Sequence, residues 1–154
     1  MTEEAIAENI DHEDTQRDKY LTFCLYDEDY GLDIGNVIEI IGVQKITQVP
    51  DMPPYIKGVI NLRGQVIPVM DMRLRFQLPP QEYDQRTCIV VTEVADQTMG
   101  LVVDRVNEVV DIPESQVEPP AGQSAGAAGS FVKGLGKIGD SIRILLDTEK
   151  ILAA

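Results

Sequence analysis

Short runs of apolar and β-branched residues, separated by turn residues, make up most of the chain. The runs at 20–26 and 87–94 have the composition of buried strands, and each is followed by a polar turn and a second apolar run. Two further pairs of runs, at 58–70 and 134–146, each enclose a turn that contains glycine. Because glycine adopts the positive φ angles of tight turns, both pairs predict β-hairpins. The pattern therefore predicts antiparallel sheet.

A short helix is expected after each of these two hairpins. Asp71 in MDMRLRFQL and Asp147 in LDTEKILAA stand where a helix N-cap belongs, ahead of residues that favour helix. Pro79 and Pro80 end the first of the two helices. The hairpin turns themselves are predicted at Arg63-Gly64-Gln65 and Gly139-Asp140-Ser141.

Two segments of the first half of the chain reappear in the second half. YGLDIGNVIEII aligns with MGLVVDRVNEVV, so Gly31 and Glu39 correspond to Gly100 and Glu108. YIKGVINLRGQVIPVMD aligns with FVKGLGKIGDSIRILLD, with a lysine-glycine pair at the same place and an aspartate as the last residue of each. The second copy contains an additional segment at 119–130, which is rich in glycine, alanine and serine and predicts a flexible excursion.

The duplication predicts a mainly β fold of two small barrels with short helices. About five short strands in each copy are best closed into a barrel, because closure removes unpaired edges. We expect a first barrel at about 20–80 and a second at about 85–154. The two barrels are expected to pack around a shared core with pseudo-twofold symmetry, and the prediction allows strands to be exchanged between them. Residues 1–19, with seven acidic and two basic side chains, are expected to form a flexible acidic tail.

Charge and hydropathy narrow the possible partners and location. Thirteen basic and 26 acidic residues give a net charge of -13, which repels nucleic acids and anionic lipid surfaces. No apolar run approaches the roughly 20 residues that cross a bilayer. We therefore expect a cytoplasmic protein that neither binds nucleic acid nor inserts into a membrane.

Residues for catalysis are scarce. The single histidine, His12, lies in the predicted tail, so no Ser-His-Asp triad, Cys-His pair or Cys/His metal site is expected. Cys24 and Cys88 lie far apart among β-forming residues and are interpreted as small buried hydrophobic side chains. GLGKIG at 134–139 matches a dinucleotide-binding pattern but lacks the βαβ context, so a nucleotide-binding enzyme is a weak alternative. We expect no enzyme, no cofactor and no metal.

The two copies together resemble the CheW family, the adaptors of bacterial chemotaxis, over residues 20 to 152. KYLTFCLYDEDYGLDIGNVIEI, YIKGVINLRGQVIPVMDMRLRF, MGLVVDRVNEVVDI and VKGLGKIGDSIRILLD carry the resemblance. It implies two intertwined five-stranded barrels of the SH3 type without catalytic activity. It also implies that the protein joins the regulatory domain of the histidine kinase CheA to the cytoplasmic tips of chemoreceptors, in membrane-associated receptor arrays. A CheV-like protein or a fragment of the CheA regulatory domain are the alternatives within this class.

The resemblance also implies partner-binding residues. The family's NLRG motif is matched by Asn61, Leu62, Arg63 and Gly64, and its arginine is implicated in receptor and kinase coupling. In the second copy Gly139 takes the place of Arg63, so the turn does not require arginine, and a hairpin tip projects the side chain into solvent.

The segment NVIEII supplies the remaining candidates. Glu39 is polar in an apolar surrounding, and one of Val37 and Ile38 must face outward if neighbouring side chains alternate. We expect an apolar groove with Glu39 and Arg63 on its rim, which would accept a helical receptor tip.

Overall fold

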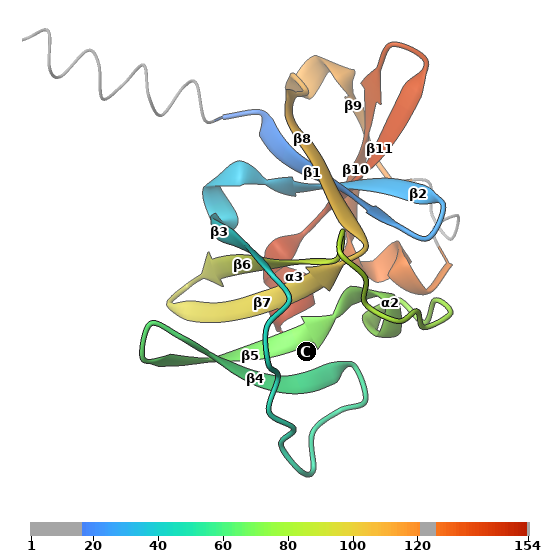
Figure 1. Ribbon diagram of the computed structural model, residues 1–154. Helices are drawn as coiled ribbons and strands as arrows, with labels where there is room; N and C mark the ends of the chain where they lie inside the picture. The colour runs from blue at the N-terminus through green and yellow to red at the C-terminus, as the bar shows by residue number, and fades with distance from the viewer. Residues whose placement is uncertain (1–16, 121–125, 154) are drawn as a thin grey trace, which may run out of the picture.

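Two β-sheets make up most of the computed structural model, which describes residues 17–120 and 126–153 (Figure 1). Six strands in the order β8-β1-β2-β11-β10-β9 form one sheet: β1 (Lys19–Leu25), β2 (Glu28–Asp33), β8 (Arg105–Asp111), β9 (Val117–Glu118), β10 (Val132–Ile138) and β11 (Ser141–Leu146). Five strands in the order β3-β6-β7-β5-β4 form the other: β3 (Val37–Gly42), β4 (Ile56–Leu62), β5 (Gln65–Asp71), β6 (Cys88–Val94) and β7 (Gln97–Val103). The mainly β fold of two SH3-type barrels is confirmed.

Each sheet takes strands from both copies of the repeat. The first copy supplies β1 and β2 to the six-stranded sheet and β3 to β5 to the five-stranded sheet. The second copy supplies β6 and β7 to the five-stranded sheet and β8 to β11 to the six-stranded sheet. The copies meet in two parallel pairs, β11 with β2 and β5 with β7, and in two antiparallel pairs, β1 with β8 and β3 with β6. The ranges 20–80 and 85–154 therefore separate the copies of the repeat and not the two sheets. Residues 1–16 of the predicted tail lie outside the described residues.

The six-stranded sheet has one strand more than predicted. Its short strand β9 pairs with β10 through Leu135 and Glu118. At the corresponding place in the other sheet, only an isolated bridge joins Thr47 to Val59. A sequence of two residues between a 3-10 helix and a proline pair carries no periodicity, which is why the pattern did not predict β9.

The predicted helices and their caps are present. The Asp71 side chain accepts a hydrogen bond from the Leu74 amide at 3.2 Å and caps α2 (Met72–Arg75). Asp147 caps α3 (Thr148–Leu152) in the same way through the Lys150 amide. Two single-turn 3-10 helices, η1 (Ile34–Asn36) and η2 (Glu114–Gln116), precede β3 and β9.

A 3-10 helix occupies the last residues of the excursion predicted at 119–130. Residues 121–125 lie outside the described residues, but a 3-10 helix, η3 (Gly126–Phe131), follows them. The prediction was wrong for this part because Phe131 packs against the main core and stacks on Phe76 with ring centroids 5.6 Å apart. That aromatic contact fixes the end of the segment.

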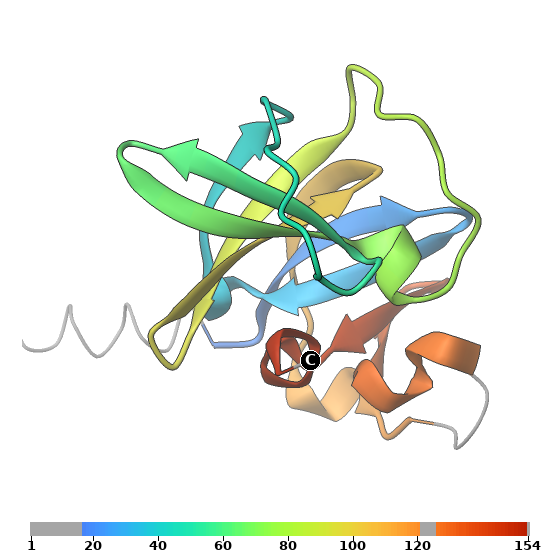
Figure 2. The ribbon, with the colours of Figure 1, turned by 90° about the horizontal axis from the view of Figure 1, so that it is seen from below.

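The largest core lies between the two sheets and is shared by them. It unites fully buried side chains of β1 and β2, such as Phe23 and Leu32, with Met70 of β5 and Leu101 of β7. Smaller clusters belong to one sheet each, around Ile60, Ile67 and Ile89 in the five-stranded sheet and around Tyr20, Ile112 and Leu145 in the six-stranded sheet. Figure 2 shows the layers from below, with the hairpin of β4 and β5 projecting at one edge. No helix among the described residues is long and apolar enough to cross a membrane.

Gly58, in β4, is expected to be intolerant of any side chain. Its φ is +145°, and a Cβ there would lie 2.1 Å from the carbonyl oxygen of Thr47. The Thr47 and Val59 backbones exchange hydrogen bonds of 2.8 and 2.9 Å at this point, so the chain cannot move away freely. Gly58→Ala should destabilise the protein by roughly 2–4 kcal/mol in urea unfolding. Gly42→Ala is the matched control, since a Cβ at Gly42 meets nothing within 4 Å. Equal unfolding midpoints for the two variants would contradict this account.

Candidate partner-binding site at the β4–β5 hairpin

The tip of the β4–β5 hairpin is a two-residue turn. Leu62 pairs with Gln65, which leaves Arg63 and Gly64 as the turn residues, with φ angles of +52° and +84°. Two positive φ angles are the signature of a type I′ turn, whose twist matches that of the strands. The Asn61 side chain accepts a hydrogen bond from the Gly64 amide at 2.8 Å. Asn61 and Gly64 therefore hold the geometry of the turn, and Gln65 already belongs to β5.

The backbone of Arg63 is in a conformation that favours glycine. A left-handed backbone costs a residue with a Cβ about 1–2 kcal/mol. The equivalent residue of the other hairpin, Gly139, has a φ of +57° and no such cost. The turn thus tolerates arginine against its own preference, and the reason for an arginine at this position lies in its side chain.

The Arg63 side chain forms a two-pronged ion pair with Glu39 of β3. One terminal nitrogen donates to Oε2 of Glu39 at 3.1 Å, and the other donates to Oε1. The hydrogen bonds from Arg63 are the main cause that lowers the pKa of the Glu39 carboxyl. The Arg63 side chain remains 69 % exposed and the Glu39 side chain 29 %. The pair joins the hairpin tip to β3 while it stays open to a partner.

Burial alternates along β3, with Ile38 and Ile40 on the outside. These side chains are 52 % and 42 % exposed, whereas Val37 packs against the shared core and Ile41 against the core of the five-stranded sheet. Ile38 is therefore the outward residue of the pair that the sequence left undecided. Glu39 alternates with these isoleucines along β3 and is half-buried. Since Glu39 and Arg63 are in contact, they form one charged edge in place of the two rims of a groove that we expected.

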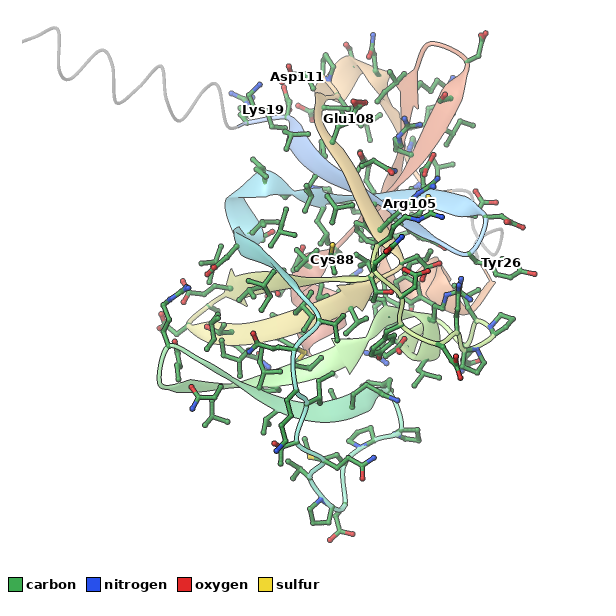
Figure 3. All side chains as sticks on the ribbon, viewed as in Figure 1. Lys19, Tyr26, Cys88, Arg105, Glu108 and Asp111 are labelled. Atoms are coloured by element: carbon green, nitrogen blue, oxygen red, sulfur yellow. The ribbon has the colours of Figure 1, made fainter. Side chains whose placement is uncertain are left out.

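The corresponding positions of the other barrel, Glu108 and Gly139, cannot form this pair. Glu39 corresponds to Glu108 on β8 (Figure 3), and Arg63 corresponds to Gly139, so the arginine is missing. At Glu108 the backbone is engaged: the Thr22 hydroxyl donates to its carbonyl oxygen at 2.7 Å, and its amide donates to the same hydroxyl oxygen at 3.2 Å. Because one barrel closes without the ion pair, the fold does not require it.

Replacing Arg63 by glycine is expected to leave the midpoint of urea unfolding unchanged or raised. Glycine relieves the left-handed backbone, whereas the lost ion pair is exposed and stabilises little. Glu39→Gln is the control, since it removes the ion pair and leaves the turn untouched. A clear fall for Arg63→Gly without a fall for Glu39→Gln would show that the arginine stem itself supports the hairpin.

The segment GLGKIG is part of a hairpin and not of a nucleotide-binding loop. Gly134 and Gly136 lie in β10, and the turn at Gly139 leads into β11 without a helix. A Cβ at Gly134 would lie 2.7 Å from the side chain of Val117, and one at Gly136 would lie 2.9 Å from that of Ile112. These two glycines therefore serve the packing of β10. The nucleotide-binding alternative fails because its strand-to-helix context is absent here.

The two barrels, the capped helices and the hairpin motif agree with a known family. The family model described as the CheW-like domain matches residues 19–154. The chain belongs to the CheW family. Among curated CheW proteins, the chemotaxis protein CheW of Klebsiella aerogenes is 36 % identical over 141 residues, covering 92 % of this chain and 85 % of the relative. The chemotaxis protein CheW of Helicobacter pylori is 32 % identical over 134 residues, covering 87 % and 81 %.

A solved CheW structure has the same fold. The crystal structure of the scaffolding protein TtCheW from Thermoanaerobacter tengcongensis superimposes with a TM-score of 0.78 at 38 % identity, covering 84 % of this chain and 88 % of that one. The family resemblance derived from the sequence is thus confirmed. The assignment of Val37, Ile38, Glu39, Asn61, Arg63 and Gly64 to partner binding stays a prediction.

Proposed function

We propose that this protein is a non-catalytic adaptor of chemotaxis that couples the cytoplasmic tips of chemoreceptors to the histidine kinase CheA. Membership of the CheW family supports the proposal, as do the names of its relatives, which are chemotaxis proteins and a scaffolding protein. The protein would act in the cytoplasm, be recruited to membrane-associated receptor arrays, and contact the regulatory domain of CheA. Neither nucleic acid nor insertion into a membrane enters this function.

The observation that carries the proposal is the Arg63–Glu39 ion pair on a turn that favours glycine. Arg63 has a left-handed backbone that is unfavourable for a residue with a Cβ, and its side chain is exposed. Glycine stands at the equivalent position of the other barrel. Such a residue contributes to recognition more than to the fold. A planar guanidinium with one carboxylate already bound can still donate to a carboxylate of a partner.

The six candidate residues divide into three roles. Arg63 and Glu39 present the charges, and Ile38, the neighbour of Glu39 on β3, supplies exposed apolar surface. Val37 packs inward and fixes the position of Ile38 on β3, while Asn61 and Gly64 fix the turn that carries Arg63. An amphipathic helix with apolar residues flanked by an acidic one fits this surface, and a receptor tip of that kind is the partner we propose for it.

Separate and combined titrations test the adaptor role. The full chain is titrated with a soluble cytoplasmic receptor fragment, with the isolated CheA regulatory domain, and with one in the presence of the other. An adaptor binds both, and saturation with one partner leaves a site for the second. Failure to bind either partner, or strict competition between them, would contradict the proposal.

A further inference from the structure

The guanidinium of Arg75, the last residue of α2, lies against the faces of two aromatic rings. Its central carbon is 4.5 Å from the centroid of the Tyr55 ring and 4.4 Å from the centroid of the Phe131 ring. A carbon atom this close to a centroid lies over the ring and not beside its edge, so both contacts combine cation–π attraction with stacking. The two rings therefore fix the position of the guanidinium.

The two rings are themselves held firmly, because they occupy equivalent positions in the two copies of the repeat. The Asp71 amide donates to the Tyr55 carbonyl at 2.8 Å, and the Asp147 amide donates to the Phe131 carbonyl at 2.7 Å. Phe131 also stacks on the buried ring of Phe76. Arg75 is thus supported by one ring from each copy, each attached to a fixed backbone.

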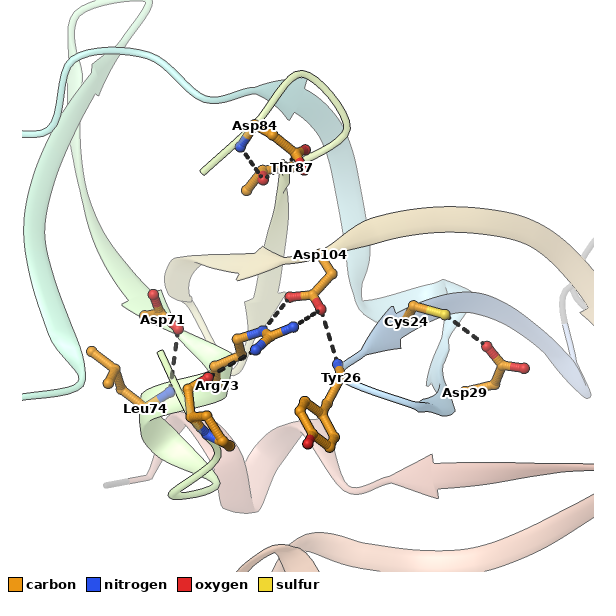
Figure 4. A network of polar contacts seen from close by, with 10 residues as sticks. Cys24, Tyr26, Asp29, Asp71, Arg73, Leu74, Asp84, Thr87 and Asp104 are labelled. Carbon is orange, nitrogen blue, oxygen red and sulfur yellow. Dashed lines mark hydrogen bonds and ion pairs between the residues drawn. The ribbon is translucent and has the colours of Figure 1, made fainter. Parts of the chain in front are cut away.

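Arg73, two residues before Arg75 on α2, has a partner for each of its side-chain nitrogens (Figure 4). It donates to Asp104 through Nε at 2.7 Å and through one terminal nitrogen at 2.5 Å. Its other terminal nitrogen donates to the Pro79 carbonyl at 2.8 Å. Arg73 is buried, and the charge of a buried arginine has to be balanced by a carboxylate in this way.

Arg75 has no such balance. Among residues 17–120 and 126–153, no carboxylate oxygen lies within 4.0 Å of a side-chain nitrogen of Arg75. Its Nε is buried and has no hydrogen-bond partner there, whereas its terminal nitrogens are not among the buried atoms without a partner. The side chain as a whole is half-buried. A fixed cation is therefore left with an open edge and without a counter-charge, which calls for an explanation.

The second copy of the repeat has no charge at the position of Arg75. The alignment that places Asp71 over Asp147 places Arg75 over Ile151, which is fully buried in α3. An apolar residue therefore satisfies the helix at this position, and the fold does not require a cation there. A partly desolvated cation without a counter-charge costs free energy. The reason for an arginine at residue 75 therefore lies in something that its guanidinium binds.

We propose that Arg75 is a preformed binding site for one carboxylate group, supplied by an acidic side chain of a partner protein. A guanidinium donates paired, charge-assisted hydrogen bonds to a carboxylate, and its fixation by the two rings lowers the entropy lost on binding. The net charge of -13 repels a free anion, and a phosphate with its higher charge more than a carboxylate. A carboxylate on a protein has further contacts to offset this repulsion.

Titration of the full chain with sodium acetate tests the site without any assumption about the partner. Ionic strength is held constant with sodium chloride, and the side-chain Nε–H signals of the arginines are followed by NMR. Arg86 is the internal control, since it is exposed and no aromatic ring of the described residues lies over it. Acetate should bind Arg75 about tenfold or more tightly than Arg86, because only Arg75 is held in place. Equal affinities at the two arginines would overturn the proposal.

A soluble receptor fragment and the CheA regulatory domain, added separately, test the source of the carboxylate. This step rests on the proposed function: if the original chain binds neither, that function fails, and the acetate titration still decides about Arg75. The partner that supplies the carboxylate should shift the Arg75 signal of the original chain. Arg75→Gln should weaken the affinity for that partner about tenfold or more, and Arg86→Gln should not.

Thermal unfolding midpoints check that both variants fold, and the signal of the original chain decides if one does not. Acetate binding at Arg75 together with unchanged affinities of Arg75→Gln for both partners would overturn a partner protein as the source. The site would then belong to free carboxylates.

Discussion

Neither the fragment 20–80 nor the fragment 85–154 is expected to fold by itself. In the first fragment β1 loses β8, β2 loses β11, β3 loses β6 and β5 loses β7, so every sheet contact between the copies is missing. The buried side chains of β1 would also lose those of β7, which fill the same core. A chain of this size buries too little apolar surface to offset its conformational entropy. Circular dichroism should show little fixed structure and no cooperative thermal transition for either fragment.

Mixing the two fragments is the control for this experiment. Because all the strands are then present, the mixture should regain a cooperative transition whose midpoint rises with concentration. This result separates the loss of strand partners from damage at the new chain ends. Cooperative melting of one isolated fragment would refute the shared core as the condition for folding.

Features that depend on local sequence were predictable. The hairpins, the two aspartate caps and the duplication follow from neighbouring residues or from alignment of the chain with itself, and the structure has them all. The exchange of strands between the two sheets was allowed by the sequence prediction but not specified by it. Both ways of pairing two similar copies bury the same apolar faces, so periodicity does not distinguish them.

Contacts between distant segments were not predictable. Glu39 and Arg63 were both expected near a partner, but 24 residues separate them, and no spacing rule reports an ion pair across a barrel. The same holds for Arg73 and Asp104, which are 31 residues apart and which the sequence did not single out. The positive φ of Arg63 was also missed. Gly64 beside it and Gly139 in the second copy both satisfy a turn pattern, but the pattern does not fix the conformation of each turn residue.

Arg63→Glu is expected to weaken binding of a receptor cytoplasmic fragment about tenfold or more while the fold is kept. The substitution removes the guanidinium that would bind a carboxylate of the partner, and it places a second negative charge beside Glu39. Stability should change little, since the side chain is exposed and the opposite hairpin closes around Gly139. Affinity for the CheA regulatory domain should fall less if the two partners use different faces.

Paired measurements on each variant separate recognition from stability: the thermal unfolding midpoint, and the two affinities. Lys150→Glu makes the same change of charge on the exposed face of α3, so its receptor affinity gives the effect of net charge alone. Arg63→Gly removes the charge and keeps the turn, and it should bind with an affinity between those of Arg63→Glu and the original chain. Receptor affinity of Arg63→Glu equal to that of Lys150→Glu would make Arg63 an ordinary surface charge. A collapsed fold would instead show that the ion pair with Glu39 holds β3 against the hairpin, which the other barrel achieves without it.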